Sequence, residues 1–248
     1  MPDEWPITEL FNQDYLHFST PRLTEQASDA DVETIWHVLG PLEGAEVLDL
    51  ACGHGRIANR LARRGVRVTG LDATPMFLEQ ARNDAERWGV PVDYVEGDMR
   101  AIPWTDRFDT VMCWFTSFGY FDDEQNRAVL AGAHRALRPG GRLLVELNHK
   151  DGLLPRFLAS TVQELDGDIQ IETHEYDPLT SRANRWRVMI RDGEIRRAFF
   201  FTRLFSFTEL RDWLLQAGFE AVNGYAGDGG ALRARSRRMI LVATKAGI

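Results

Sequence analysis

The fold is decided by the stretch Val47-Leu48-Asp49-Leu50-Ala51-Cys52-Gly53-His54-Gly55-Arg56-Ile57-Ala58. This stretch begins as a short apolar run that is typical of a β-strand, and it ends as the first turn of a helix. Two glycines lie between the two parts. A tight turn from strand to helix needs residues that tolerate positive φ and let a ligand approach the backbone. The stretch therefore predicts a nucleotide-binding turn.

Three classes of nucleotide site share such a turn. A phosphate-binding P-loop needs a Lys followed by Ser or Thr after the second glycine, but Arg56-Ile57-Ala58-Asn59 follows here, so this class is excluded. A dinucleotide-binding turn needs G-x-G-x-x-G/A, and this turn satisfies the pattern through Ala58. Asp72 also lies about 20 residues further on, where a ribose-binding acid is expected. The third class of nucleotide site differs from the other two by an acid four residues before the first glycine. Asp49 supplies that acid here.

Composition limits the class of protein. A chain of 248 residues can bury one large core, so we expect one domain with an insertion. The formal net charge of −8 offers no basic surface to nucleic acid or to an anionic membrane. The basic run 233–238 fits a solvated loop better than a polyanion site. No segment approaches the roughly 20 apolar residues of a membrane span, and the N-terminus lacks the basic and apolar parts of a targeting signal.

Cys52 and Cys113 are the only cysteines, and both lie in apolar contexts at strand ends. They provide neither a disulfide framework nor a metal cluster, which favours a reducing compartment. We therefore expect a cytoplasmic protein with no metal, no nucleic-acid partner and no membrane partner.

Strand and helix signals alternate up to about residue 150. Helical spacing of apolar residues predicts a helix over 24–39 that ends at Gly40-Pro41, and Pro75 fits the first position of a later helix. Alternation at this spacing implies a parallel sheet built from right-handed crossover units. The predicted strands are 47–50, 66–71, 91–95, 108–114 and 142–147, and the predicted helices between them are 55–64, 75–88 and 123–137.

The pattern changes after residue 150. A short helical stretch near 153–159 and three strand-like runs, separated by turn signals, indicate an antiparallel insertion. A helix and two further strands are then predicted. The three runs of the insertion are 169–176, 185–190 and 195–205, the helix is 207–217, and the last strands are 219–225 and 239–244.

Residues 1–20 are rich in aromatic side chains without regular spacing. This segment is too irregular for a strongly amphipathic helix, so we expect it to pack over another part of the molecule. Its aromatic residues are Trp5, Phe11, Tyr15 and Phe18.

Candidate site residues follow from the predicted sheet. In an open parallel sheet, ligands bind beyond the carboxyl ends of the strands. Asp72 lies there and can accept hydrogen bonds from both hydroxyls of a ribose. It could also cap the helix that starts near Pro75, and one residue could do both. The expected positions are Asp49 to Gly55, Asp72, Asp98, Met99, the run 113–120 and Glu146 to His149.

Asp98 and Met99 follow the third predicted strand. Asp98 is placed to accept a hydrogen bond from the exocyclic amine of adenine, and Met99 offers soft apolar area to the ring. The alternative is a turn aspartate beside a core methionine.

Five motifs, taken in order over residues 30–147, resemble class I S-adenosylmethionine-dependent methyltransferases of the bacterial small-molecule type. The resemblance implies a Rossmann-like α/β fold: a doubly wound, mostly parallel seven-stranded sheet with a reversed last strand, plus a small antiparallel insertion. A nicotinamide enzyme is not expected to combine Asp49 with the Gly-Asp-Met segment. The motifs are VLDLACGHGR (47–56), TGLDATPM (69–76), EGDMR (96–100), FDTV (108–111) and LRPGG (137–141).

The resemblance also implies which residues bind S-adenosylmethionine. Ala51, Gly53 and Gly55 are expected to face its methionine part, Asp72 its ribose, and Asp98 with Met99 its adenine. Asp49, Ala73 and Trp114 complete the expected cofactor-binding set. The implied organisation is an N-terminal lid and leading helix (1–40), a cofactor-binding core (41–150), a substrate-covering insertion (151–206) and a C-terminal completion of the core sheet (207–248).

The run Trp114 to Phe121 resembles the corresponding segment of bacterial small-molecule methyltransferases, including N-methyltransferases of nucleotide-linked amino sugars. No Asn-Pro-Pro-Tyr or Asp-Pro-Pro-Tyr motif follows the fourth strand, which argues against amino-methyltransferases of nucleic acid and of protein glutamine. Trp186 and the run 199–201 could line an apolar acceptor pocket or, at alternate positions, pack the insertion onto the main sheet.

Tyr15, Tyr120 and His149 are candidates for orienting or deprotonating the acceptor. Each has a structural alternative: Tyr15 as an aromatic residue that packs a lid, Tyr120 as a core residue where a helix begins, and His149 as an exposed turn residue. His54 is expected to serve the geometry of the glycine turn or the cofactor carboxylate.

The expected function is transfer of a methyl group from S-adenosylmethionine to an O, N or C nucleophile of a small molecule, with secondary metabolism as one setting. Two alternatives stay open: an NAD-dependent oxidoreductase that uses the same glycine turn, and an S-adenosylmethionine-binding protein without methyl transfer. The sequence specifies neither the acceptor nor the oligomeric state.

Overall fold

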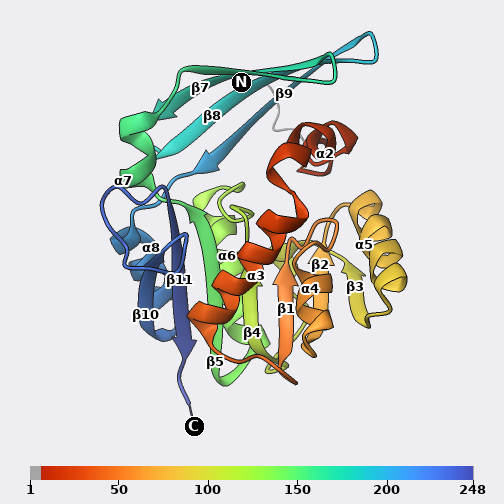
Figure 1. Cartoon of the computed structure of the whole chain (residues 1–248). Coiled ribbons are helices and arrows are strands. Elements are labelled where there is room, and N and C mark those ends of the chain that lie inside the picture. Colours follow the sequence, from red (N-terminus) through yellow and green to blue (C-terminus); the bar gives the residue numbers. More distant parts are fainter. Residues whose placement is uncertain (1–6, 248) are drawn as a thin grey trace.

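A computed structural model describes residues 7–247 of the chain, and the side chains of residues 9–247. Within these residues, the larger sheet has seven strands in the order β10-β11-β5-β4-β1-β2-β3 (Figure 1). Neighbouring strands run parallel except at β11, which is antiparallel to both β5 and β10. The predicted fold class is therefore confirmed. The strands are β1 (Glu46–Leu50), β2 (Arg67–Asp72), β3 (Val92–Glu96), β4 (Phe108–Cys113), β5 (Leu137–Asn148), β10 (Phe219–Ala226) and β11 (Arg238–Lys245).

Helices cover both faces of this sheet. Successive side chains of a strand point to opposite faces, so Val47 and Leu144 join one apolar core while Leu48 and Val145 join the other. Helices α3, α4 and α5 pack on the first core, and α6 and α8 pack on the second. These helices are α3 (Glu25–Leu39), α4 (Ala58–Arg63), α5 (Pro75–Trp88), α6 (Asp123–Ala136) and α8 (Phe207–Gln216).

Local signals set the helix boundaries. The side chain of Thr24 accepts a hydrogen bond from the N–H of Ala27 at 3.1 Å and caps α3, and Gly40 ends that helix with φ of +76°. Pro75 occupies the first position of α5, as predicted, because its missing N–H is not needed there.

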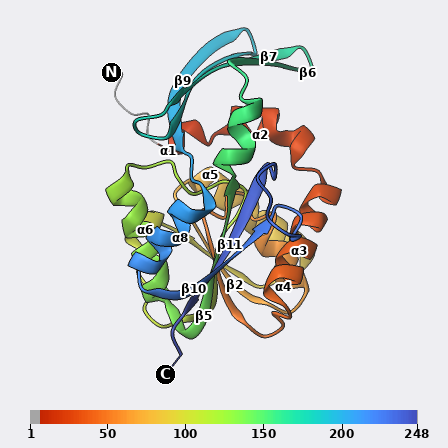
Figure 2. The same ribbon diagram turned by 90° about the vertical axis from the view of Figure 1, so that its left-hand side faces the viewer.

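The insertion is an antiparallel sheet with the strand order β6-β7-β8-β9. It stands over the carboxyl ends of the main parallel strands, with α2 beside it (Figures 1 and 2). Four strands are present where three were predicted, because β6 alternates polar residues with only Val162 and Leu165 and gives no strong apolar signal. The helical part also begins earlier than predicted. The elements are α7 (Lys150–Leu153), η3 (Leu154–Arg156), β6 (Ser160–Leu165), β7 (Asp168–Asp177), β8 (Arg182–Arg191) and β9 (Glu194–Arg203).

The N-terminal segment is helical and attached to the insertion. Asp14 of α2 is buried and binds Arg196 at 2.6 Å and Arg191 at 3.1 Å, so two arginines of the β8–β9 hairpin hold α2 against the sheet. Burial would raise the pKa of Asp14, but these arginines outweigh burial and lower it. Trp5 lies outside the described residues. The described elements are α1 (Ile7–Leu10), α2 (Gln13–Ser19) and η1 (Thr20–Arg22). None of the helices in the described part has the length and apolar character that crossing a membrane requires.

Candidate ligand-binding site

The two glycines of the turn have different surroundings. Gly53 has φ of +56° and faces a cavity, since a Cβ added there would meet only Phe77 at 3.9 Å. Gly55 has φ of +75° and lies against Tyr94 and Ala81, where an added Cβ would overlap the Tyr94 hydroxyl. Gly55 was predicted to face the methionine part of the cofactor, but the space where a side chain would lie is filled by protein and not by the cavity. Its hydrogen atom instead lets the turn pack closely on β3 and α5.

Asp72 joins the glycine turn to the start of α5. One carboxylate oxygen accepts the N–H of Gly53 and the other accepts the N–H of Thr74, each at 2.8 Å. Burial raises the pKa of Asp72, and the two N–H donors partly offset that effect. Each oxygen has a second lone pair. Asp72 can therefore organise the turn and still accept hydrogen bonds from a ligand.

A cavity, which we call the first cavity, lies at the carboxyl rim of the main sheet beside this turn. Eight of the nine predicted cofactor-binding residues line it, and Gly55 is the exception. They come from the ends of four neighbouring strands, β1 to β4, as the rule for open parallel sheets predicts. The eight are Asp49, Ala51, Gly53, Asp72, Ala73, Asp98, Met99 and Trp114.

Aromatic rings form one wall of the first cavity. The ring centroids of Phe11 and Tyr15 are 4.9 Å apart, and those of Tyr15 and Phe77 are 6.1 Å apart. The cavity holds about 110 Å³, whereas small-molecule pockets begin at about 300 Å³. A ligand the size of a nucleoside with an amino acid attached exceeds this volume, and Phe11, Tyr15 and Phe77 are rings that border it.

Asp98 is partly exposed and bound by its own loop. Its carboxylate accepts the backbone N–H of Arg100 at 2.8 Å and the guanidinium of Arg100 at 2.6 Å. The bond from the Arg100 side chain is the main reason that the pKa of Asp98 is lowered. Asp98 is therefore ionised near neutral pH and can act as an acceptor at the edge of the cavity.

Asp49 lies at the end of β1 and is only 3% exposed. Burial raises the pKa of its carboxyl to about 8; Arg56 lowers the value somewhat, and Asp72 adds to the rise. Near neutral pH the buried carboxyl is therefore mostly protonated in the ligand-free chain.

The raised pKa of Asp49 gives a testable pH dependence. The folded-state pKa of about 8 exceeds the ordinary value of 3.8, so between these values the folded chain keeps a proton that the unfolded chain releases. The contribution of Asp49 to the free energy of unfolding is therefore greatest below about pH 4, and it is lost as the pH rises through about 8. Relative to D49N, the unliganded wild type should lose up to about 1.4 kcal/mol of unfolding free energy per pH unit between about pH 5 and 7. Urea unfolding of both proteins at several pH values measures this difference. A constant difference across the range would contradict the assignment.

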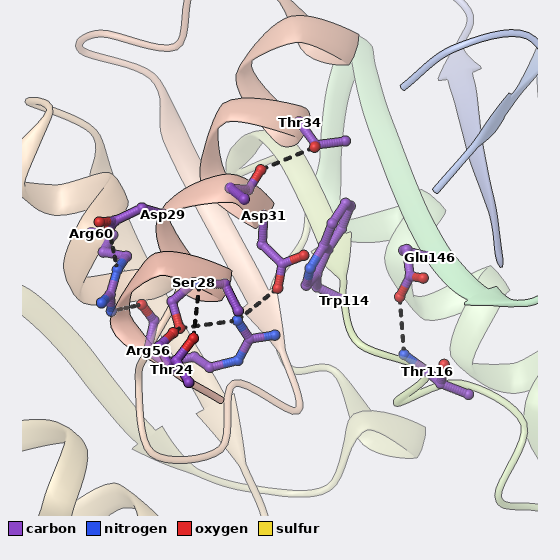
Figure 3. A network of polar contacts seen from close by, with 12 residues as sticks. Thr24, Ser28, Asp29, Asp31, Thr34, Arg56, Arg60, Trp114, Thr116 and Glu146 are labelled. Atoms are coloured by element: carbon purple, nitrogen blue, oxygen red, sulfur yellow. Dashed lines mark hydrogen bonds and ion pairs between the residues drawn. The ribbon is translucent and has the colours of Figure 1, made fainter. Parts of the chain in front are cut away.

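Arg56 and Trp114 each present a donor without an acceptor to this region. One terminal nitrogen of Arg56, Nη1, donates to Asp31 of α3 at 2.7 Å and to Ser28 at 3.4 Å (Figure 3). The other nitrogen, Nη2, and Nε1 of Trp114 are buried and have no hydrogen-bond partner among the described residues. Both residues line the first cavity. Buried donors need acceptors, so an anionic group of a ligand would satisfy them.

The side chain of Glu146 on β5 holds the loop that follows β4. Thr116 has φ of +58° and donates its N–H to the Glu146 carboxylate at 3.2 Å. Glu146 is 1% exposed and paired with Arg238. Burial raises the pKa of Glu146, and the positive charge of Arg238 partly offsets this rise. Phe115, with φ of +63°, carries the Arg56 guanidinium 4.6 Å above its ring. Arg56 was not among the site residues predicted from the sequence. Its position directly after the second glycine was the available signal.

Two of the three residues proposed to contact an acceptor lie at the cavity. Tyr15 and Tyr120 line both the first cavity and a larger second cavity under the insertion. Burial raises the pKa of Tyr120 to about 12, with Arg185 lowering it in part, so the phenol stays protonated at neutral pH. It can therefore donate a hydrogen bond but is a poor base.

His149 lines neither cavity. It is 3% exposed, its Nδ1 lies 3.0 Å from the carbonyl of Ser236, and it pairs with Phe205 in a β-bridge. The interpretation as an exposed turn residue was wrong, because β5 continues to Asn148 and His149 packs beside Phe205. Substrate contact by His149 stays a prediction, and its position outside both cavities does not support it. His54 lines the first cavity, and burial lowers its pKa to about 4, so it is neutral.

The aromatic run of the insertion divides between its two faces. Phe200 lines the second cavity, and its ring lies 6.3 Å from that of Tyr120. Trp186 packs on Phe199 at 5.2 Å on the outer face and is 40% exposed. The possible acceptor-pocket role of Trp186 is therefore contradicted.

The main sheet, parallel except for one reversed strand, has the class I methyltransferase fold. An acid lies at the carboxyl end of each of β1, β2 and β3, and all three acids line the first cavity. Residues 47–141 match the family described as a methyltransferase domain, and this segment contains the glycine turn and all three acids. The resemblance found in the sequence is therefore confirmed.

Similar proteins support this assignment over different lengths. The putative methyltransferase YqeM of Bacillus subtilis is 32% identical over 141 residues, which are 56% of this chain and 57% of the relative. The chain spans about half the length of the curated relatives it matches. The CcbJ methyltransferase of Streptomyces caelestis is 24% identical, with 89% of this chain and 90% of the other covered and a TM-score of 0.75. SAM-bound CalS10, an amino pentose methyltransferase of Micromonospora echinaspora, is 23% identical, with 95% of this chain and 98% of the other covered and a TM-score of 0.66. The two structural matches show the fold.

Proposed function

We propose that this chain transfers the methyl group of S-adenosylmethionine to an O, N or C nucleophile of a small molecule. The observation that carries the proposal is that Asp49, Asp72 and Asp98 all line one cavity beside the glycine turn. The family match over 47–141 and the methyltransferases among its relatives support the reaction. The structural likeness to an amino pentose methyltransferase supports a small acceptor.

The residues of the first cavity fit the parts of S-adenosylmethionine. Asp72 would accept from the ribose hydroxyls through its remaining lone pairs, and Met99 would pack against the adenine. The unpartnered nitrogens of Arg56 and Trp114 would donate to the carboxylate of the methionine part. When bound, S-adenosylmethionine supplies a methyl group that its sulfonium already activates. The main task left to the protein is alignment of the acceptor.

Tyr15 and Tyr120 would orient the acceptor, since both line the boundary between the two cavities. The phenol of Tyr120 stays protonated and would donate a hydrogen bond to an acceptor oxygen or nitrogen. The segment that carries Phe11 and Tyr15 would act as a lid, because its rings narrow the first cavity. The insertion would then cover the acceptor.

A cytoplasmic location accords with this proposal. Cys52 and Cys113 are free and buried thiols, as a reducing compartment permits. Cell fractionation with an antibody against the chain would test the location.

Calorimetric titration tests the cofactor assignment. We expect S-adenosylhomocysteine to bind the purified chain at least about tenfold more tightly than NADH, because Asp49 and the Asp98–Met99 pair suit an adenosyl amino acid. Binding of NADH without S-adenosylhomocysteine would instead favour the oxidoreductase.

A second measurement separates catalysis from binding alone. Purified chain is incubated with S-adenosylmethionine and a panel of amines, phenols and acids, and release of S-adenosylhomocysteine is measured. Release that depends on one acceptor supports methyl transfer. Tight cofactor binding without release for any member of a broad panel would favour a binding protein.

A further inference from the structure

The second cavity lies between the insertion and the rim of the main sheet and has a volume of about 750 Å³. It shares five lining residues with the first cavity, so a molecule bound in it would adjoin the proposed cofactor site. The shared residues are Phe11, Tyr15, Phe115, Ser117 and Tyr120. Alternate residues of β7, β8 and β9 face it, as the pleat of a sheet requires. These are Gln170, Glu172, Arg185, Arg187, Phe200 and Thr202.

The wall of this cavity carries an excess of positive charge. Five arginines line it, but only one acid, Glu172, does so. Glu172 is already bound by Arg187 at 2.6 Å and by His174 at 3.1 Å. Arg238 is paired with the buried Glu146. Among the described residues, no ion pair is formed by the other three arginines, which are Arg22, Arg185 and Arg237.

Arg185 is the most enclosed of these three arginines. It is half-buried near the middle of β8, whereas Arg22 and Arg237 are exposed. Its neighbours in register are His174 on β7 and Phe200 on β9, and its guanidinium lies 5.7 Å from the Phe200 ring centroid. Neither neighbour supplies a negative charge. Burial would raise the pKa of Glu172, but the charges of Arg187 and Arg185 help to lower it. The Glu172 carboxylate is bound by Arg187 and His174 and not by Arg185.

A partly buried cation without a directly bound counter-ion is less favourable than a paired one, and an anion in the cavity would provide that pairing. The feature is local, because the whole chain has a net charge of −8. The planar guanidinium of Arg185 presents N–H groups in a fork that matches the two oxygens of a carboxylate or phosphate.

We propose that the second cavity binds the anionic part of the methyl acceptor, a carboxylate or a phosphate, through Arg185. This inference rests on the proposed function and names the substrate class of the same site. Arg22 and Arg237, at exposed positions of the wall, add to the positive potential that attracts such an acceptor.

The test uses pairs of amine acceptors that differ in charge. The carboxylate pair is 3-aminobenzoate and 3-aminobenzamide, and the phosphate pair is glucosamine 6-phosphate and glucosamine. Binding to the full chain saturated with S-adenosylhomocysteine is measured by calorimetry. We expect the anionic member of at least one pair to bind about tenfold or more tightly than its neutral partner, and the pair that responds identifies the anion. Equal affinity within both pairs, or no binding of either anion at millimolar concentration, would overturn the inference.

Matched variants assign the effect to Arg185. R185Q should remove the preference for the anion, whereas R197Q should keep it, because Arg197 is exposed on the opposite face of the same sheet and pairs in register with Val188. Both variants should bind S-adenosylhomocysteine as the wild type does. Loss of the preference in both, or in neither, would overturn the role of Arg185. Failure of the wild type to bind S-adenosylhomocysteine at all would instead count against the proposed function.

Discussion

D72N should bind S-adenosylhomocysteine about 100-fold or more weakly than the wild type. The carboxylate of Asp72 accepts two backbone N–H groups, from Gly53 and Thr74, and lines the first cavity. An amide in its place has one acceptor oxygen and no charge, so one of these N–H groups or a ribose hydroxyl loses its partner. Hydrogen bonds to charged groups contribute about 1.5–3 kcal/mol each, and about 1.4 kcal/mol corresponds to a tenfold change in affinity. Calorimetric titration measures the loss directly.

D98N is the matched control for D72N. The Asp98 side chain is 39% exposed and already bound by Arg100, so water can replace much of what its charge provides. We expect a loss of less than about tenfold in affinity for S-adenosylhomocysteine. Thermal unfolding of both variants shows whether each chain is folded during the titration. A larger effect for D98N than for D72N would place the ribose elsewhere and contradict the assignment of Asp72.

The sequence was sufficient for the residues that depend on strand order. Asp49, Asp72 and Asp98 were predicted together because parallel strands end at the same edge of a sheet, and all three line one cavity. That inference needs only the alternation of strands and helices and the position of each acid at a strand end. It does not need side-chain packing.

Residues that depend on packing were missed or misplaced. Gly55 belongs to the same motif as Gly53, but the approach of Tyr94 from β3 turns it away from the cavity. His149 follows a predicted strand end, yet β5 runs further than the apolar pattern indicated. Arg185 could not be assigned from sequence, because its place depends on which face of the insertion turns toward the main sheet. Distant pairings decide that orientation.

G55A should be the most destabilising single substitution considered, with a loss of about 3–5 kcal/mol in the free energy of unfolding. The backbone of Gly55 has φ of +75°, which costs an L-residue about 1–2 kcal/mol. The added Cβ would also lie 2.8 Å from the Cβ of Ala81 and overlap the Tyr94 hydroxyl. That hydroxyl is buried and donates to Asn59 at 2.7 Å, so displacing it breaks a buried hydrogen bond. Urea unfolding measures the loss.

G65A separates the steric effect from the backbone effect. Gly65 has φ of +81°, close to that of Gly55, but an added Cβ would meet nothing within 4 Å. It should therefore cost only the backbone term of about 1–2 kcal/mol. If G55A does not fold, the double variant G55A/Y94F provides the comparison, because removing the hydroxyl removes the closest clash. The double variant should then be more stable than G55A, even though Y94F alone is destabilising because it leaves Asn59 without its donor. Equal losses in G55A and G65A would show that close packing against Tyr94 is not what requires glycine at position 55.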